Sequence, residues 1–329
     1  MTEMKKSVSV VMCTYNGEKY IEEQLDSIIG QSYAVEEIVI QDDGSTDKTI
    51  DIVKRYQQKH SNIRLFVNER NLGFNANFIS AIQKASGNYI ALSDQDDIWD
   101  RNKIEIQLEA MGDHLVSFHK TKAFSVEGTK IKHETAPKTP NFSLERLVYG
   151  NVVSGHTILM KRSFIQLIPH LSDFSSYFKY WYYDHILAIV AASYGGLIYV
   201  DQALTAHRRL ASSASYSIPQ DYSHTFLNAV RYVQATISIY RNKSAVMKAY
   251  FSRMYQFLLK LPETHTRDAL LLCRLHMKRT VLNYLWLTLK CIQLRNVITA
   301  PFRTKGFFNF CKAAVFPIYC SEYFKDKEK

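Results

Sequence analysis

Short apolar runs alternate with helical patterns through the first hundred residues, and this alternation constrains the fold more than any other feature. Strands are expected at residues 7–13, 36–41, 63–68 and 88–93, which are short and rich in β-branched residues. Each of the first three is followed by a segment whose apolar residues recur every three or four positions, as they do along one face of a helix. This order predicts a parallel sheet with helices on both of its faces.

Polar residues come directly after three of these strands. They are Thr14, Tyr15 and Asn16 after the first, Asp42 and Asp43 after the second, and Asp94, Asp96 and Asp97 after the fourth. Because ligands bind beyond the carboxyl ends of the strands in open α/β sheets, the three groups are expected at one edge. A hard divalent cation, Mg²⁺ or Mn²⁺, would relieve the mutual repulsion of the acids in ALSDQDDIWD. A solvated turn with a helix cap is the alternative for either acidic motif alone.

Four segments, in this order, resemble the family 2 glycosyltransferases: SVSVVMCTYNGEKYIEEQLDSI, IVIQDDGSTDKT, NLGFNANF and YIALSDQDDIWDRNKI. The resemblance is close over residues 7–110 and continues more loosely to about residue 215. It implies the GT-A fold, which is an α/β fold with a Rossmann-like mixed sheet. It also implies metal-dependent, inverting transfer of a sugar from a nucleotide-diphospho-sugar to a glycan or polyprenyl-linked glycan in cell-surface polysaccharide biosynthesis. The SDQDDIW form resembles rhamnosyltransferases, so dTDP-rhamnose is the first donor expected and a UDP-sugar the alternative.

The resemblance also assigns residues to the donor. Thr14 and Tyr15 would lie beside the nucleotide base, and the Asp43 carboxylate would accept the hydrogen bond of its imide N–H. Asp96 would be the direct metal ligand, with Asp94 nearer the ribose as a second ligand. The remaining candidates are Asp97 acting through water, Lys103 approaching the diphosphate, and Asn71, Gly73 and Asn77 in a loop beside the nucleotide. An exposed helix lysine is the alternative for Lys103, and a turn with a helix start is the alternative for the loop.

The resemblance places the catalytic base in YWYYDHILAIVAASYG, where it selects Asp184. A position at a helix N-terminus is expected to keep Asp184 ionised. The alternative is a carboxylate that serves only the helix dipole, and His185 is the second choice for the base. In GHTILM, His156 is a candidate contact for the acceptor, although a partly buried, hydrogen-bonded histidine is the stronger expectation.

The segment LTAHRRLASSAS resembles the YRxH stretch that folds over the diphosphate in this family. Arg208 falls on the arginine and would bind phosphate through two hydrogen bonds. His207 stands in place of the aromatic residue, and Leu210 stands in place of the histidine. His207 is therefore a weak candidate to replace the missing histidine.

The charge of the chain is unevenly distributed. Residues 221–329 carry 18 Lys and Arg against 6 Asp and Glu, whereas the whole chain has a net charge of +10. We expect a GT-A catalytic domain over residues 1–220, with a nucleotide-sugar half (1–110) and an acceptor half (111–220), followed by a basic helical region (221–329). This basic region is interpreted as a solvated helical surface, an anionic membrane surface contact or, least favoured, a nucleic-acid site; the membrane contact is preferred.

Location and competing functions follow from what the sequence contains. No run of eighteen uninterrupted apolar residues occurs, the first residues carry no apolar leader, and the five cysteines are scattered without a CxxC pair. A cytoplasmic protein, peripheral on the inner face of the membrane, is therefore expected. A nucleotidyltransferase is disfavoured because no Gly-rich loop follows the first strand, and a non-catalytic membrane scaffold with a decayed site is disfavoured by the intact acids.

Overall fold

The computed structural model describes residues 6–125, 140–169, 181–209, 236–278, 280–298 and 307–324. The chain divides into two compact units. The first unit comprises Met1–Thr135, Val153–Ala191 and Gly196–Pro219, and the second comprises Ala136–Val152, Ala192–Gly195 and Gln220–Lys329.

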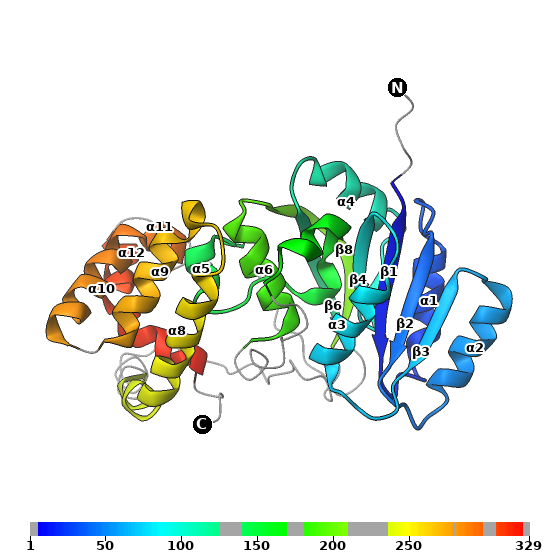
Figure 1. Ribbon diagram of the computed structural model, residues 1–329, viewed down its shortest axis with the longest axis horizontal. Coiled ribbons are helices and arrows are strands. Elements are labelled where there is room, and N and C mark those ends of the chain that lie inside the picture. The colour runs from blue at the N-terminus through cyan, green and yellow to red at the C-terminus, as the bar shows by residue number, and fades with distance from the viewer. Residues whose placement is uncertain are drawn as a thin grey trace. The chain divides into compact units, whose positions relative to one another are not determined.

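One sheet organises the first unit, and its described strands lie in the order β3-β2-β1-β4-β7-β6-β8-β5 (Figure 1). The strands are β1 (Val8–Thr14), β2 (Glu37–Asp42), β3 (Ile63–Val67), β4 (Tyr89–Ser93), β5 (Ile98–Trp99), β6 (Val116–Ser125), β7 (Leu159–Lys161) and β8 (Leu197–Arg209). The first four are parallel, as the β–α alternation predicts. β7 runs antiparallel to β4 and β6, and β5 runs antiparallel to β8, so the complete sheet is mixed, as the GT-A resemblance implied.

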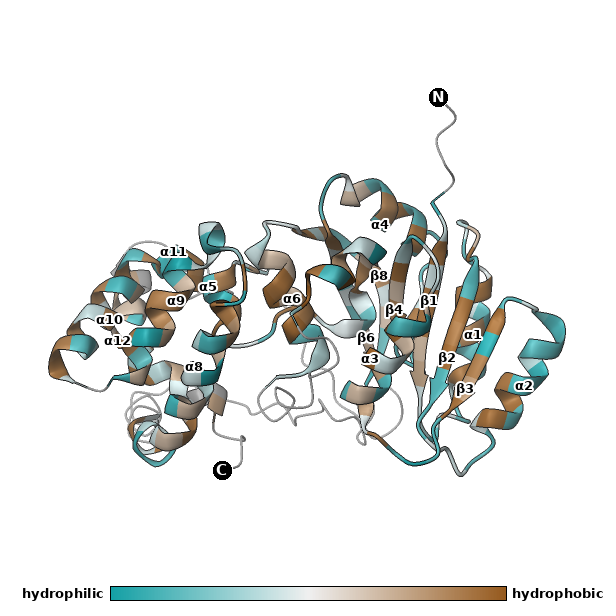
Figure 2. Ribbon diagram, viewed as in Figure 1, coloured by the Kyte–Doolittle hydropathy of each residue, from teal (hydrophilic) through white to brown (hydrophobic). Residues whose placement is uncertain are grey.

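Helices cover both faces of the parallel half. The described helices of the first unit are α1 (Ile21–Ile29), α2 (Thr49–Lys59), α3 (Phe74–Lys84), α4 (Lys103–Met111) and α6 (Tyr183–Ser193), with the 3-10 turns η1 (Gly155–Thr157) and η2 (Arg162–Leu167). Every residue of β1 and of β2 is buried, which requires cover on both sides of these strands. Figure 2 shows the hydrophobic residues that run along β2.

The two faces have separate packing partners. Leu25 of α1 and Ile104 of α4 cluster with Val10 and Met12 of β1, which alternation along the strand places on one face. Phe78 of α3 is buried but lies outside this cluster, although α3 contacts β1 and β2. The helix α3 therefore packs on the opposite face.

The second unit is helical in its described residues. Its elements are α5 (Leu144–Leu147), α8 (Ser244–Leu258), α9 (Glu263–Met277), α10 (Val281–Gln293), α11 (Arg295–Ile298), α12 (Phe307–Tyr319) and the 3-10 turn η4 (Cys320–Phe324). Aromatic rings form its core: Phe251 stacks on His276 at 4.0 Å, and Tyr149 packs edge-on against both. None of the described helices combines the length and the apolar character needed to cross a membrane.

Glu37 at the start of β2 ties neighbouring strands together. Its carboxylate accepts hydrogen bonds from Ser9 Oγ at 2.6 Å and Ser86 Oγ at 2.7 Å, and it pairs with Arg64 at 2.7 Å. Burial raises the pKa of Glu37, but these donors outweigh it and hold the pKa at about 2. Because the folded pKa lies below the ordinary value of 4.5, this carboxylate stabilises the fold above pH 4.5 and loses that effect as pH falls towards 2.

We predict that Glu37→Gln lowers the free energy of unfolding at pH 7 by about 2–3 kcal/mol. The difference from the wild type should shrink steadily below pH 4.5. Urea denaturation at pH 7, 5 and 3.5 measures it, with the exposed neighbour Glu36→Gln as the matched control. A difference that stays constant with pH would show that the ionised carboxylate is not the source of the stability.

Candidate active site

The first two strands end on a shared hydrogen bond. Thr14 and Asp42 are paired in the parallel register, and Thr14 Oγ1 donates to Asp42 Oδ2 at 2.7 Å. Asp42 also accepts from the backbone N–H groups of Gly44 and Ser45 and from Ser45 Oγ. Gly44 has a φ of +81°, which a glycine adopts without strain. The first acid of DDGS therefore builds the turn.

The second acid of that motif, Asp43, organises the next loop. Its Oδ1 accepts from Asn68 Nδ2 at 2.7 Å and from the Leu72 N–H at 2.8 Å, and its Oδ2 accepts from the Gly73 N–H at 2.9 Å. A carboxylate has about four acceptor sites, so three bonds leave capacity for one more donor. This arrangement brings the loop with Asn71 beside Asp43.

The three loop residues named from the sequence differ in their surroundings. Asn71 is exposed, and its side-chain oxygen accepts from the N–H of Gly73, whose φ is +79°. Asn77 is buried and donates to the Gln41 carbonyl at 2.9 Å. Asn77 thus connects α3 to β2, whereas Asn71 faces solvent.

Gln95 lies between Asp94 and Asp96, the two acids of an Asp-x-Asp (DxD) pattern, and connects them to the first strand. Its Oε1 accepts from the Tyr15 N–H at 2.9 Å, and its Nε2 donates to the Tyr15 carbonyl at 3.1 Å. A Cβ at Gly17 would approach Gln95 Oε1 to 2.4 Å, so any larger residue there would displace the Gln95 amide from Tyr15. The sequence interpretation missed this contact, for which the only signal was an amide side chain at the middle position of DxD.

Among Asp94, Asp96 and Asp97, Asp96 has the fewest positively charged or hydrogen-bonding partners for its carboxylate. Burial raises the pKa of Asp96, and the neighbouring charges of Asp94 and Asp97 raise it further, to about 7. His156 Nδ1 lies 3.3 Å from Asp94 Oδ2. Asp94 therefore has a close basic partner, while Asp96 has mainly like charges around it.

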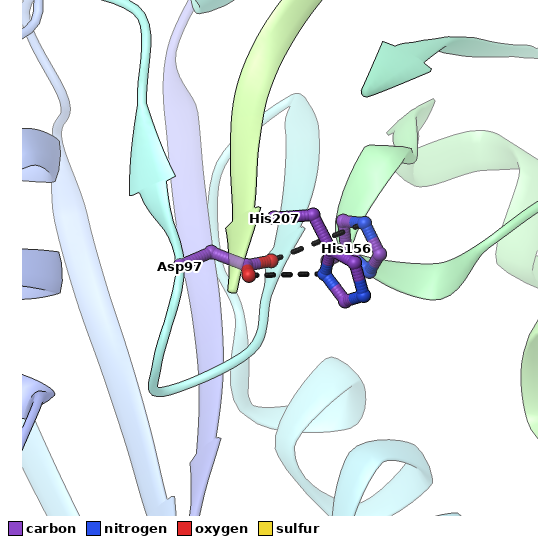
Figure 3. A group of neighbouring side chains, drawn as sticks. All are labelled: Asp97, His156 and His207. Atoms are coloured by element: carbon purple, nitrogen blue, oxygen red, sulfur yellow. Dashed lines mark hydrogen bonds and ion pairs between the residues drawn. The ribbon is translucent and has the colours of Figure 1, made fainter. Parts of the chain in front are cut away.

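Asp97 lies beside two histidines whose rings stack on each other, and its carboxylate points towards both (Figure 3). Its Oδ1 is 3.0 Å from His207 Nδ1, and its Oδ2 is 3.9 Å from His156 Nε2. Asp97 Oδ2 and His156 Nε2 are both buried, and neither has a hydrogen-bond partner. Ligand atoms of the three residues all lie within 4.8 Å of one another, so the group has the composition and spacing of a metal-binding set.

Hydrogen bonds and histidine charges govern the ionisation of Asp97. Burial raises its pKa, but the hydrogen bond with His207, the charge of His156 and the Arg208 N–H at 3.0 Å together lower it below the ordinary value. Asp97 is therefore a stable anion at neutral pH. The sequence interpretation gave His156 and His207 only weak roles, because residues 97, 156 and 207 are brought together by the fold.

Arg208 of β8 holds the acidic turn, residues 94–97, in place. Its Nε donates to the Asp96 carbonyl at 2.8 Å, and its guanidinium pairs with Glu23 of α1. The same group lies over the rings of Tyr20 and Phe124, at 4.3 and 4.7 Å. The pairing with Glu23 was not anticipated from the sequence. Leu210, which replaces the family histidine, lies outside the described residues.

Lys103 has an interior position, so its interpretation as an exposed helix lysine is wrong. The side chain is fully buried at the start of α4. Its Nζ donates to Gln107 Oε1 at 2.7 Å and lies 4.0 Å from the centre of the Trp99 ring. Burial lowers the pKa of this amine to about 7.

Asp184 is the second residue of α6, as the sequence indicated. Its Oδ2 accepts from the Gly155 N–H at 3.2 Å, and its Oδ1 accepts from the His185 N–H at 2.7 Å. Burial outweighs both donors and raises the pKa of Asp184 to about 7, with a further rise from the charge of Asp94. The expectation that the helix N-terminus keeps Asp184 ionised is therefore wrong below about pH 7.

Close packing fixes the start of α6. A Cβ at Gly155 would meet Tyr183 Oη at 1.9 Å, so only glycine fits beside this ring. Tyr183 stacks on Phe78 at 4.3 Å, and its N–H donates to Asn75 Oδ1 at 2.9 Å. Because His156 follows Gly155, the turn η1 carries both the partner of Asp94 and a donor to Asp184.

The mixed sheet with acids beyond its strand ends defines the class as GT-A, and a solved structure agrees. The crystal structure of S. aureus TarS 1-349 in complex with UDP-GlcNAc aligns with a TM-score of 0.54 and 18% identity. The alignment covers 98% of this chain and 92% of that one. The expected GT-A fold with a helical C-terminal part is therefore confirmed.

Residues 9–168 match the family model described as glycosyl transferase family 2. Residues 9–168 therefore form a family 2 glycosyltransferase domain, as the four motifs implied.

Two curated relatives carry more specific names. The putative teichuronic acid biosynthesis glycosyltransferase TuaG of Bacillus subtilis is 34% identical over 155 residues, which cover 46% of this chain and 62% of TuaG. The UDP-Glc:alpha-D-GlcNAc-diphosphoundecaprenol beta-1,3-glucosyltransferase WfgD of Escherichia coli is 38% identical over 111 residues, which cover 34% of this chain and 43% of WfgD. The chain thus spans less than two thirds of the length of either relative.

We predict that Asp184→Asn makes the protein more stable at pH 8. The folded pKa of Asp184 is raised from 3.8 to about 7, so its protonated form favours folding at low pH, and this stability is lost as pH rises through 7. Asparagine is uncharged, but its amide nitrogen cannot accept one of the two backbone N–H bonds. The variant should therefore gain about 1–2 kcal/mol at pH 8 and lose about 1 kcal/mol at pH 4.

Thermal melting at both pH values measures this effect. The control is Asp51→Asn, an exposed first-turn aspartate of α2 that is expected to change little. A variant of Asp184 that melts below the wild type at pH 8 would contradict the assigned cost of ionisation.

Proposed function

We propose that the protein transfers a sugar, with inversion, from a nucleotide-diphospho-sugar to a hydroxyl of a glycan or polyprenyl-linked glycan in cell-surface polysaccharide biosynthesis. The observation that carries this proposal is the turn η1, which joins the two acids: the Gly155 N–H donates to Asp184 at 3.2 Å, and the neighbouring His156 lies 3.3 Å from Asp94. A carboxylate suited to be the base therefore lies near the acidic turn, and burial raises its pKa to about 7. A base near pH 7 suits proton abstraction at neutral pH.

The donor side of the proposed site comprises the residues that the family pattern selects. We assign donor binding to Thr14, Tyr15, Asp43, Asn71, Asp94, Lys103 and Arg208. The free acceptor capacity of Asp43 supports its role towards an imide N–H of the base. For Lys103 and Arg208, the side-chain contacts with Gln107 and Glu23 mean that donor binding requires a change of partner.

The proposed step is a single in-line displacement. Asp184 accepts the proton of the acceptor hydroxyl, and the oxygen forms a bond to the anomeric carbon of the donor sugar. The bond between that carbon and the diphosphate oxygen breaks, and the nucleoside diphosphate leaves with the electron pair. The N–H of Gly155 holds Asp184 in position through its hydrogen bond.

The residues present fit a divalent cation, which we propose is held by Asp96 and Asp94. The raised pKa of Asp96 reflects the repulsion that a cation would relieve, and the two buried atoms without partners, on Asp97 and His156, lie close by. When bound, Mg²⁺ or Mn²⁺ would stabilise the negative charge that develops on the leaving diphosphate. Since His156 and His207 add imidazole nitrogens, a transition metal such as Mn²⁺ is favoured over Mg²⁺.

The relatives support a UDP-sugar ahead of dTDP-rhamnose. TarS was crystallised with UDP-GlcNAc, and the name of WfgD specifies UDP-Glc and a diphosphoundecaprenol-linked acceptor. Only the SDQDDIW motif favours rhamnose. An assay with UDP-Glc, UDP-GlcNAc and dTDP-rhamnose, each with Mn²⁺ and with Mg²⁺, tests the proposal by donor hydrolysis. Pyrophosphate release from a nucleoside triphosphate would indicate a nucleotidyltransferase, and no turnover with any donor would indicate a scaffold.

We predict that Asp184→Asn keeps donor binding within about threefold but lowers the turnover rate by 10²-fold or more, because general-base catalysis typically contributes 10²–10⁴-fold. Wild-type turnover should fall below pH 7, as Asp184 becomes protonated. Donor binding is measured by calorimetry and turnover by nucleoside diphosphate release, with Asp51→Asn as the control. Unimpaired turnover of the Asp184 variant would place the base elsewhere.

We predict that Asp96→Asn abolishes Mn²⁺ binding by the protein alone, as measured by electron paramagnetic resonance of free Mn²⁺. His156→Gln should weaken Mn²⁺ binding about tenfold and Mg²⁺ binding much less, if its imidazole is a ligand. Equal losses for both ions would assign His156 only an electrostatic role towards Asp94. Normal Mn²⁺ binding by the Asp96 variant would rule out the proposed ligand.

A further inference from the structure

Helix α10 exposes a continuous row of apolar side chains. The residues of this α10 apolar face are Val281 (80% exposed), Leu282 (63%), Leu285 (55%), Trp286 (57%) and Leu289 (57%). At about 100° per residue they cover an arc of roughly 140° around the helix. The opposite side carries Leu287 and Cys291, which are buried. Single exposed apolar residues are ordinary, but a continuous row of this kind marks an interaction surface.

The surrounding chain is strongly basic. Between residues 269 and 321 the sequence contains no Asp or Glu and eight basic residues: Arg274, Lys278, Arg279, Lys290, Arg295, Arg303, Lys305 and Lys312. Of the described ones, Arg274 and Lys278 are exposed, and Lys290 pairs with Asp268. An apolar face within an acid-free, positively charged segment is complementary to a surface with an apolar interior and a negatively charged outer layer.

We propose that the α10 apolar face docks on an anionic lipid bilayer, with the helix lying parallel to the membrane. Thirteen residues give a helix of about 20 Å, which suits an interfacial position and is too short to span the bilayer. Trp286 supplies the amphipathic indole that favours the level of the headgroups. The inference rests on the proposed function in one respect: a polyprenyl-linked acceptor would lie at this surface.

A second copy of the chain is the competing occupant, and the charge argues against it. Two copies meeting through α10 would bring together two acid-free segments of positive net charge. An anionic bilayer offers the opposite charge, at about 1 kcal/mol for each basic residue near the surface. The bilayer is therefore the favoured occupant.

Trp286 provides a direct probe. The protein has three tryptophans, and Trp99 and Trp181 are only 4% and 1% exposed, so a change at the membrane surface reports on Trp286. Vesicles containing phosphatidylglycerol should shift the fluorescence to the blue, and brominated lipid should quench it. Pure phosphatidylcholine vesicles should do neither at physiological salt. Trp286→Phe should remove the shift and the quenching while flotation with the vesicles persists.

A charged substitution on the face supplies the matched comparison. Leu285→Glu combined with Leu289→Glu should weaken vesicle flotation at least tenfold. Leu259→Glu, at the end of α8 and 53% exposed, should leave flotation unchanged. Flotation that is equal for the wild type and the double variant would overturn the proposal. So would sedimentation that shows a wild-type dimer, a monomeric double variant and no vesicle binding, because the face would then join two copies.

Donor hydrolysis in the absence of membrane separates this proposal from the proposed function. The double variant should hydrolyse donor at the wild-type rate, because α10 contributes no residue to the proposed active site. A protein that binds vesicles through α10 but hydrolyses no donor would contradict the proposed function and support membrane docking. A protein that hydrolyses donor but does not bind anionic vesicles would contradict only the membrane-docking proposal.

Discussion

The crowding of three carboxylates at the end of β4 is the constraint on which the candidate site depends. Like charges at such short separation oppose folding unless each has a partner. Asp97 has its partners in His207 and in the backbone N–H of Arg208, and Asp94 has His156. Asp96 has no comparable partner among the described residues, which is why its pKa rises to about 7. The acid left uncompensated by the protein is therefore the one that the DxD pattern assigns to a metal.

The compensating groups come from the mixed half of the sheet. His207 and Arg208 lie near the end of β8, and His156 lies in the turn before β7. Arg208 also pairs with Glu23, so the acidic turn is held between α1 and β8. The parallel strands place the carboxylates at one edge of the sheet. The mixed half supplies the histidines and the backbone N–H that offset their repulsion.

The strands and the acids at their ends were predictable because both depend on local pattern. Short apolar runs rich in β-branched residues located β1 to β4 within one or two residues, and the rule that ligands bind beyond strand ends predicted Asp43 and Asp94 at one edge. The Gln95–Tyr15 and Arg208–Glu23 contacts were not predictable, since each joins residues 80 or more positions apart and leaves no periodic signal.

Burial was the other property that local pattern could not supply. The position of Lys103 at a helix start predicts an exposed side chain, yet packing of α4 buries it completely. For Asp184, the sequence shows the helix N-terminus that favours the anion, but it does not show the burial that opposes it. The structure decides between these effects, because desolvation of Asp184 exceeds the two hydrogen bonds that it accepts.

This balance couples the acidic turn to the proposed base through charge. The charge of Asp94 raises the pKa of Asp184, and the charge of His156 lowers it. Any positive charge that neutralises Asp94 therefore lowers the pKa of Asp184. The proposed base would become more ionised when a cation is bound beside Asp94 and less ionised when none is bound. Such coupling requires no movement of the backbone, only that η1 keeps His156 beside Asp94 and the Gly155 N–H on Asp184.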